Sequence, residues 1–439
     1  MWMKAVFQLV ILTMICLPAA AASQGQQGQQ GQQRTLTLND AIRAALESNA
    51  DVGIAEEVRI QASSRVKEQY SVLLPNVGGS VGFTNQTINL GSRGLDFPGI
   101  PHMGGPFSNL DARFVYSQPV LDLTLIRRYR SARESAGSSE SDTLAVRNRV
   151  AAMVATLYFG VQRARAREES VTAQIALDET LLKLANDRRE AGVGTGLDVT
   201  RAQARLATDQ YELVESRDQA RTSELRLLRA IGDSLDVRVE LTDPLASGVF
   251  EASPAAEAVA TAFRNRPELR SEESRLAAAR LTLGAAHAEA LPSIRAFADY
   301  GNSGNRSVFI PTRTVGIQVN VPLFEGGRRA AHRETAQSQL RQAEIRAKDV
   351  RDQIEVDVRV AVEAFASARE LLRASEQSLR LAEEELALSR LRFEAQVTTQ
   401  VDVISAQAAL AAARFRHVNA LFGVRSAEIE YRRAVGVSW

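Results

Sequence analysis

The sequence predicts a mainly α-helical protein with a smaller membrane β-part, arranged as two internal repeats of helix, strand, strand, long helix and helix. The first observation is the repeat itself. The segment G-V-G-T-G-L-D-V at 192–199 is matched 204 residues later by Q-V-T-T-Q-V-D-V at 396–403. The second is proline placement, because all twelve prolines avoid the windows 120–243 and 323–439. Long proline-free stretches rich in Ala, Leu, Glu, Arg and Gln form helices, and a repeat of this length is a whole structural unit.

The overall charge argues against a nucleic-acid partner. The chain has 53 Lys and Arg against 52 Asp and Glu, whereas nucleic-acid-binding domains have a clear basic excess. Only 5% of the residues are aromatic, which fits long helices better than a mixed globular core.

Residues 1–22 have the features of a signal peptide. Lys4 supplies the positive charge, an apolar stretch follows, and a run of small residues ends at Ala22, where we expect cleavage. The only cysteine, Cys16, lies inside this leader, so the mature chain is expected to have no thiol for a disulfide, a metal site or catalysis. No later stretch is apolar enough for a membrane helix. We therefore expect a periplasmic, secreted or outer-membrane β-protein.

The mature chain divides into two repeats joined by a linker. A helix capped by Thr37 or Asn39 is expected to run towards Leu74. In the second repeat one helix begins at Ser253-Pro254, and another begins at Asn265 to Glu268 and runs to Leu291. A disordered Gln/Gly-rich segment is expected at 23–34. The first repeat is expected at 35–232, with strands at about 76–90 and 108–120 and a helical hairpin at 123–231. After a linker at 233–252, the second repeat is expected at 253–439, with strands at about 293–303 and 312–324 and a helical hairpin at 328–435.

The second long helix contains a heptad pattern. Large residues recur every seven positions, and a small residue follows three positions after each of the first four. Such a seam of one large and one small residue lets neighbouring helices approach closely. A solvated coiled coil would show the same spacing. The residues are Phe365, Leu372, Leu379, Leu386 and Phe393, with Ala368, Ser375, Ala382 and Ser389.

The strand segments alternate between apolar and polar residues. Val315, Ile317 and Val319 alternate with glycine and polar residues, and residues 110–118 show the same period of two. This pattern is typical of membrane strands with one lipid face and one lumen face, although a half-buried soluble sheet would also show it. The signal peptide and the missing membrane helix favour membrane strands.

Four strands cannot close a membrane barrel, because the smallest such barrels have about eight strands. An open edge in lipid would leave unpaired backbone groups at a cost of several kcal/mol each. Membrane strands therefore require an oligomer, either a dimer with eight strands or a trimer with twelve. The small polar residues of the inward face favour a lumen over a packed interior.

Three segments give the chain a resemblance to a known family. They are the strand-to-helix corner V-P-L-F-E-G-G-R at 321–328, the hairpin turn at 191–199, and L-P-S at 291–293. Together with the two repeats they resemble the TolC-like outer membrane efflux proteins over essentially the whole mature chain. The resemblance implies a homotrimer with a twelve-stranded barrel in outer-membrane lipid and a twelve-helix periplasmic α-barrel, with the linker in the equatorial region. It also implies an exit duct of a tripartite pump or type I secretion system, with a periplasmic adaptor and an inner-membrane transporter as partners.

The two hairpin turns are expected at the far end of the rods, where the family contacts its adaptor. Gly192 would in any case permit a tight turn, and this role is compatible with adaptor contact. The candidates implied by the resemblance are Gly192, Val193, Gly194 and Thr195 in the first turn and Gln396, Val397 and Thr398 in the second.

The family closes its entrance close to these turns. Asp402 matches the aspartate of an acidic ring, which would favour cations, whereas a second ring aspartate falls at Ser405. The family's polar lock joins a tyrosine and an arginine to an aspartate that matches Asp198, but the partners fall at Phe393 and Thr398. We therefore expect apolar packing to hold this entrance. N-capping after a turn is the alternative role for both aspartates.

No motif indicates catalysis, a metal or a cofactor. The four histidines lack metal-ligand spacing, and we expect a protein that is not an enzyme. The alternative to a duct is a periplasmic or secreted coiled-coil scaffold without a pore. The apolar alternation at 110–116 and 315–323 separates the two.

Overall fold

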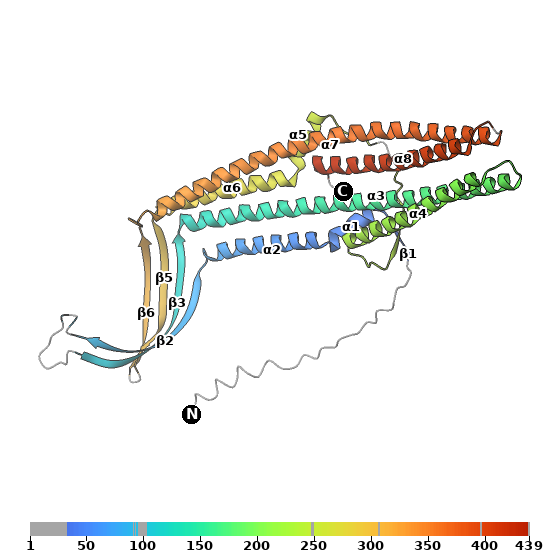
Figure 1. Ribbon diagram of the computed structural model, residues 1–439. Coiled ribbons are helices and arrows are strands. Elements are labelled where there is room, and N and C mark those ends of the chain that lie inside the picture. Colours follow the sequence, from blue (N-terminus) through green and yellow to red (C-terminus); the bar gives the residue numbers. More distant parts are fainter. Residues whose placement is uncertain are drawn as a thin grey trace, which may run out of the picture.

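The computed structural model describes residues 33–90, 92, 94, 103–246, 250–305, 308–395 and 397–437. The expected signal peptide therefore lies outside the described residues. Long helices run side by side along one axis, four strands bend away from them at one end, and the hairpin turns lie at the other end (Figure 1).

The elements follow the same order twice. The first repeat comprises β1 (Gln33–Leu36), α1 (Leu38–Ser48), α2 (Ala50–Ser71), β2 (Asn76–Asn89), β3 (Met103–Leu121), α3 (Leu123–Glu190) and α4 (Gly196–Ile231). After β4 (Arg238–Leu241), the second repeat comprises α5 (Ala255–Asn265), α6 (Pro267–Ala288), β5 (Ser293–Gly304), β6 (Phe309–Asn320), α7 (Arg328–Glu394) and α8 (Gln400–Val435). At about 1.5 Å per residue, α3 and α7 are each roughly 100 Å long.

Three expectations are corrected. The segment 23–34 was expected to be disordered, but Gln33 and Arg34 begin β1. This strand pairs in parallel with β4, so its partner comes from the linker. The helix expected to run towards Leu74 breaks at Asn49, whose side chain accepts from Asp51 N at 2.9 Å and donates to the Ala230 carbonyl at 3.0 Å. The last strand begins at Phe309 and ends at Asn320, not at 312–324.

The four long strands form one antiparallel sheet in the order β2-β3-β5-β6. The pairing register places apolar residues of neighbouring strands side by side on one face. Val77 lies opposite Tyr116, Tyr116 opposite Ala298, and Ala298 opposite Val315. One face is therefore mainly apolar across the sheet, with Arg313 and Asn302 on it towards the loop end. Much of this face is exposed in the single chain, with Val81 78% and Val315 80% exposed. This face contains Val77, Val81, Phe83, Leu110, Phe114, Tyr116, Ala298, Tyr300, Val315, Ile317 and Val319.

The other face of the sheet is polar. Arg113 contacts Asp111 on its own strand and Asp299 on β5, the latter at 3.0 Å. Polar groups thus pair with each other on one side while the other side presents hydrocarbon, as expected for lumen and lipid faces. The outer edges of β2 and β6 have no partner strand in this sheet.

The strands join the helices at a corner built from two left-handed glycines, Gly326 (φ +57°) and Gly327 (φ +86°). Just before them, Leu323 and Phe324 are 86% and 87% exposed. Residues other than glycine rarely adopt a positive φ, and two such residues in succession are rarer still. The corner motif therefore sets the direction in which α7 leaves the sheet.

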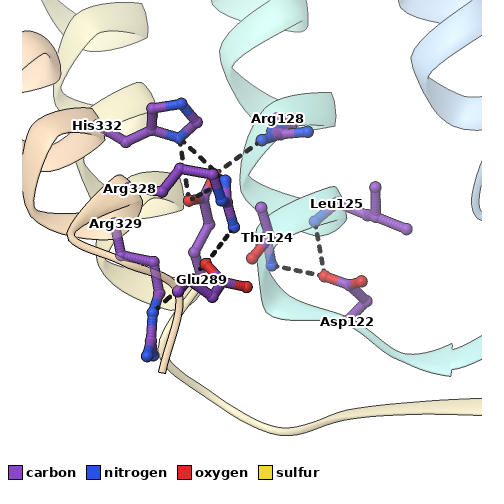
Figure 2. Close-up of polar contacts among 9 residues, drawn as sticks. Asp122, Thr124, Leu125, Arg128, Glu289, Arg328, Arg329 and His332 are labelled. Carbon is purple, nitrogen blue, oxygen red and sulfur yellow. Dashed lines mark hydrogen bonds and ion pairs between the residues drawn. The ribbon is translucent and has the colours of Figure 1, made fainter. Parts of the chain in front are cut away.

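A cluster of charges fixes the starts of α3 and α7 against the end of α6. Figure 2 shows Glu289 among its basic neighbours, with Arg128 at 3.0 Å, His332 at 3.2 Å and Arg328 at 3.5 Å. Close by, Asp122 caps α3 by accepting from the N–H groups of its second and third residues at 2.9 and 3.0 Å. Each helix N-terminus at this corner is thus tied down by side chains.

The helical part has matching cores in the two repeats. Val150 and Val154 of α3 are buried against α1 and α4, and Ile354 and Val358 occupy the positions 204 residues later in α7. Towards the tips, the small heptad residues Ala368, Ser375 and Ala382 are buried. Among the described residues, no helix combines the length and the apolarity needed to cross a bilayer.

Candidate functional site at the helical tips

The first tip is a tight turn closed by its own backbone. Helix α3 ends at Glu190, with Ala191 as its C-cap, and Gly192 adopts a left-handed conformation with φ +72°. The N–H groups of Val193 and Gly194 donate to the Arg188 carbonyl at 3.0 and 2.9 Å. The Gly192 N–H donates to the Arg189 carbonyl at 3.1 Å. These three bonds satisfy two of the last carbonyls of the helix, as in other glycine-containing helix ends.

Thr195 and Asp198 start the next helix as a capping box. The Asp198 N–H donates to Thr195 Oγ1 at 3.2 Å, and Asp198 Oδ2 accepts from the Thr195 N–H at 3.0 Å. The threonine is thus the N-cap, and the aspartate is the third helical residue rather than the cap itself. Hydrogen bonds from Thr195 lower the pKa of Asp198, so this stabilisation exists above the ordinary aspartate pKa and is lost as the pH falls below it.

The second tip uses the same device. Asp402 accepts from the Thr399 N–H at 3.2 Å, from Thr399 Oγ1 at 3.1 Å, and from the Thr398 hydroxyl. These hydrogen bonds, of which the one from Thr398 has the largest effect, lower the pKa of Asp402. Thr398 therefore contacts Asp402 of its own hairpin. Gln396 lies outside the described residues.

Both tips present apolar side chains to solvent at matching positions. Val193 and Leu197 are 59% and 57% exposed, and their counterparts Val397 and Val401 are 68% and 49% exposed. Val193 and Val397 are 204 residues apart, as are Leu197 and Val401, so the two hairpins end in similar apolar surfaces. Such exposed apolar groups are a feature of protein contact sites.

Phe393 contacts an arginine that sequence reasoning missed. The Arg188 guanidinium lies 4.4 Å from the centre of the Phe393 ring, and its Nη1 donates to the Phe393 carbonyl at 3.2 Å. This contact joins the ends of α3 and α7, and hence the two hairpins. The sequence around Arg188 gave no signal of this contact, because Phe393 is 205 residues away in the chain.

Asp402 and Ser405 line a groove between α7 and α8 near the second tip. Both are exposed, and Glu384, Glu385 and Arg392 line the same groove. The groove is therefore rich in carboxylates, with Asp402 and Ser405 one helical turn apart. Asp198 lies on the other hairpin.

Known proteins resemble this chain in sequence and in fold. A family model described as outer membrane efflux protein matches residues 41–233 and 258–437. The pyoverdine export outer membrane protein OpmQ of Pseudomonas aeruginosa is 26% identical over 422 residues, covering 92% of this chain and 85% of the relative. The alkaline protease secretion protein AprF of the same species is 28% identical over 304 residues, covering 67% of this chain and 62% of the relative.

A solved structure shows the same architecture. The outer membrane protein VceC of Vibrio cholerae superposes with a TM-score of 0.79 at 18% identity, covering 91% of this chain and 96% of that chain. This likeness confirms the predicted fold class, in which long helices continue into a strand part. The family model, which spans both repeats, confirms the family that the sequence resembles. The chain belongs to the outer membrane efflux protein family.

Proposed function

We propose that this protein is a homotrimeric channel-tunnel in the outer membrane. The observation that supports this most strongly is the apolar face that continues in register across all four strands, together with the open edges of β2 and β6. In a trimer, β6 of one copy pairs with β2 of the next, which gives twelve strands and leaves no edge in lipid. The polar face with Arg113 then lines the lumen.

The duct accepts cargo from a periplasmic adaptor and an inner-membrane transporter. Support comes from the relatives, whose names include export of pyoverdine and secretion of alkaline protease. The proposal therefore covers both tripartite efflux and type I secretion. The adaptor would bind the exposed tips, where Val193 and Val397 are the central apolar residues, flanked by Gly192, Gly194, Thr195, Gln396 and Thr398.

A pore-free scaffold is the alternative, and the apolar sheet face argues against it, because water would meet a continuous hydrocarbon surface there. The test is to fractionate cells, purify the protein in detergent, and measure its native mass and its conductance in planar bilayers. A mass of three chains with ion conductance supports the duct. A protein that stays soluble without detergent and conducts nothing contradicts it.

Asp402 is proposed to set the charge preference of the entrance. Changing Asp402 to Arg replaces three negative charges by three positive ones in the trimer, so we expect the cation preference to fall or reverse. The reversal potential in a salt gradient measures this. Thr399→Ala is the control, because it removes the N-cap without changing charge. Equal reversal potentials for wild type and Asp402→Arg would remove Asp402 from the pore.

Arg188 is proposed to hold the resting entrance closed through Phe393. A cation–π contact at a partly exposed site contributes about 0.5–1 kcal/mol, so Arg188→Gln should raise the ratio of open to closed channels by up to about fivefold per chain. The open fraction in single-channel recordings is the measurement. The neighbouring exposed Arg189→Gln is the matched control. If both variants behave alike, the contact does not hold the entrance.

A further inference from the structure

Two aspartates are buried between the helices on the tip side of the bundle. Asp178 on α3 and Asp209 on α4 are each only 2% exposed, and the Asp178 carboxyl group lies within hydrogen-bonding reach of the Asp209 carboxyl group. Arg205 Nη2 lies 3.0 Å from Asp209 Oδ1. A single guanidinium is thus the only cation that the described residues place against two buried carboxyl groups.

The hydrogen bonds around Asp178 are uneven. Its Oδ1 accepts from the side-chain amides of Gln174 on α3 and Gln407 on α8, both at 3.1 Å. Its Oδ2 is buried and receives no hydrogen bond from any described residue, and neither do the two Asp209 oxygens. A buried acceptor without a donor loses its hydrogen bonds to water and gains none in return, which is unfavourable. A proton on one carboxyl group would supply the missing donor.

We propose that Asp178 and Asp209 share one buried proton, and that this acid–carboxylate pair holds α3 against α4 and, through Gln407, the first hairpin against the second. When the proton leaves, two negative charges face each other in a site with one arginine. The contact between the hairpins then loosens.

The electrostatics of the site agree with a retained proton. Burial is the first cause that raises the pKa of Asp178, and the neighbouring Asp209 is the second; together they raise it from 3.8 to about 7. Arg205 lowers it. Among the described residues, neither aspartate forms an ion pair with any group other than Arg205. The partners that α3 and α8 supply to Asp178 are the uncharged amides of Gln174 and Gln407.

The sign of the pH effect follows from this raised pKa. The closed site retains its proton up to about pH 7, whereas an opened, hydrated site releases it near pH 3.8. The stabilisation is therefore complete below the lower value and declines as the pH rises towards 7. The local opening constant should rise about tenfold per pH unit over this range and level off above it.

A metal ion is a poorer occupant than a proton. The amide N–H groups of both glutamines point at Asp178 and would repel a cation. The Arg205 guanidinium already stands beside Asp209. Hard cations such as calcium also need about six to eight oxygen ligands, more than the two carboxyl groups provide.

The experiment measures hydrogen exchange and infrared spectra of the full chain in detergent between pH 5 and pH 8. In the wild type, protection factors of peptides around Asp178, Asp209 and Gln407 should fall steeply up to about pH 7 and then level off. A protonated-carboxyl C=O band should persist while protection falls and should disappear only around pH 7, where the closed site loses its proton. In Asp178→Asn the pH dependence and the band should be lost, because the new amide donates without titrating. Asp209→Asn is the second variant in case the first does not fold.

The controls change the same charge at exposed positions of the same helices. Asp187→Asn on α3 and Asp218→Asn on α4 should retain the wild-type pH profile. The proposal of a shared proton is overturned if the protection factors of the wild type do not depend on pH. It is also overturned if Asp178→Asn shows the same pH profile as the wild type. A profile that a chelator shifts also overturns it and assigns the site to a metal ion. Since all these groups belong to one chain, the result is the same whether or not the protein conducts.

Discussion

Replacing Val315 by arginine is expected to remove most of the folded protein from the outer membrane, whereas Thr314→Arg next to it should be tolerated. Val315 is 80% exposed on the apolar face of β6, and Thr314 points to the polar face opposite Asp299. An arginine on the lipid face of a membrane barrel costs about 2–4 kcal/mol near the midplane. In a trimer the three copies add to roughly 6–12 kcal/mol, which is comparable to the whole stability of a domain.

The measurement is the amount of heat-modifiable oligomer in the outer-membrane fraction, compared on unheated and heated gels. The adjacent-residue pair keeps the position along the strand and the added charge constant and changes only the face. Equal amounts of oligomer for Val315→Arg and Thr314→Arg would mean that the sheet does not present this face to lipid. The alternation would then belong to a soluble sheet.

Local periodicity explains why much of this fold could be predicted from the sequence. The period of two at 314–319 predicted a strand with two unlike faces, and the register adds that the same face continues over three more strands. The proline-free windows predicted the long helical hairpins. The heptad predicted a packing seam that contains Phe365 and Ala368, and both residues are buried in the structure. Each of these signals is contained in one short stretch of the chain.

The features that the sequence did not reveal depend on partners far away in the chain. Arg34 joins a strand because β4 lies beside it, about two hundred residues later. Asn49 interrupts a helix because the Ala230 carbonyl lies within reach of its side chain. At the candidate site, capping by Thr195 is local, whereas the contact of Arg188 with Phe393 joins the two repeats.

The buried carboxyl pair was missed for a related reason. Asp178 and Asp209 lie 31 residues apart on two helices. Both helices have charged residues every few positions, a pattern that predicts exposure to solvent. Only the packing of α3 against α4 and α8 shows that these two charges are enclosed. A sequence pattern gives the period of a helix but does not show which polar residue on its inner face lacks a partner.

Glu224→Ala is expected to give the largest loss of stability in the helical part. The Glu224 side chain is only 4% exposed and lies between Arg221 at 3.1 Å, Arg165 at 3.4 Å and Arg238 at 3.5 Å. It also accepts from the buried Val239 N–H at 3.0 Å. One carboxylate thus joins α3, α4 and β4, and it fixes the strand that pairs with β1.

Removing that carboxylate leaves three arginines close together and a buried N–H without an acceptor. Breaking a buried pair from one side costs about 3–5 kcal/mol, and the three arginines reach water, with side chains 31–68% exposed. We therefore expect a loss near 3 kcal/mol for Glu224→Ala. Glu224→Gln should cost less, because its amide oxygen can still accept from Val239. Equilibrium unfolding in denaturant measures both, with exposed Glu215→Ala on the same helix as the control. If Glu224→Ala unfolds at the same denaturant concentration as Glu215→Ala, the carboxylate does not hold β4 in place. The parallel pairing with β1 must then be maintained by its other contacts, among them the strand ladder and the packing of Leu36 and Val239.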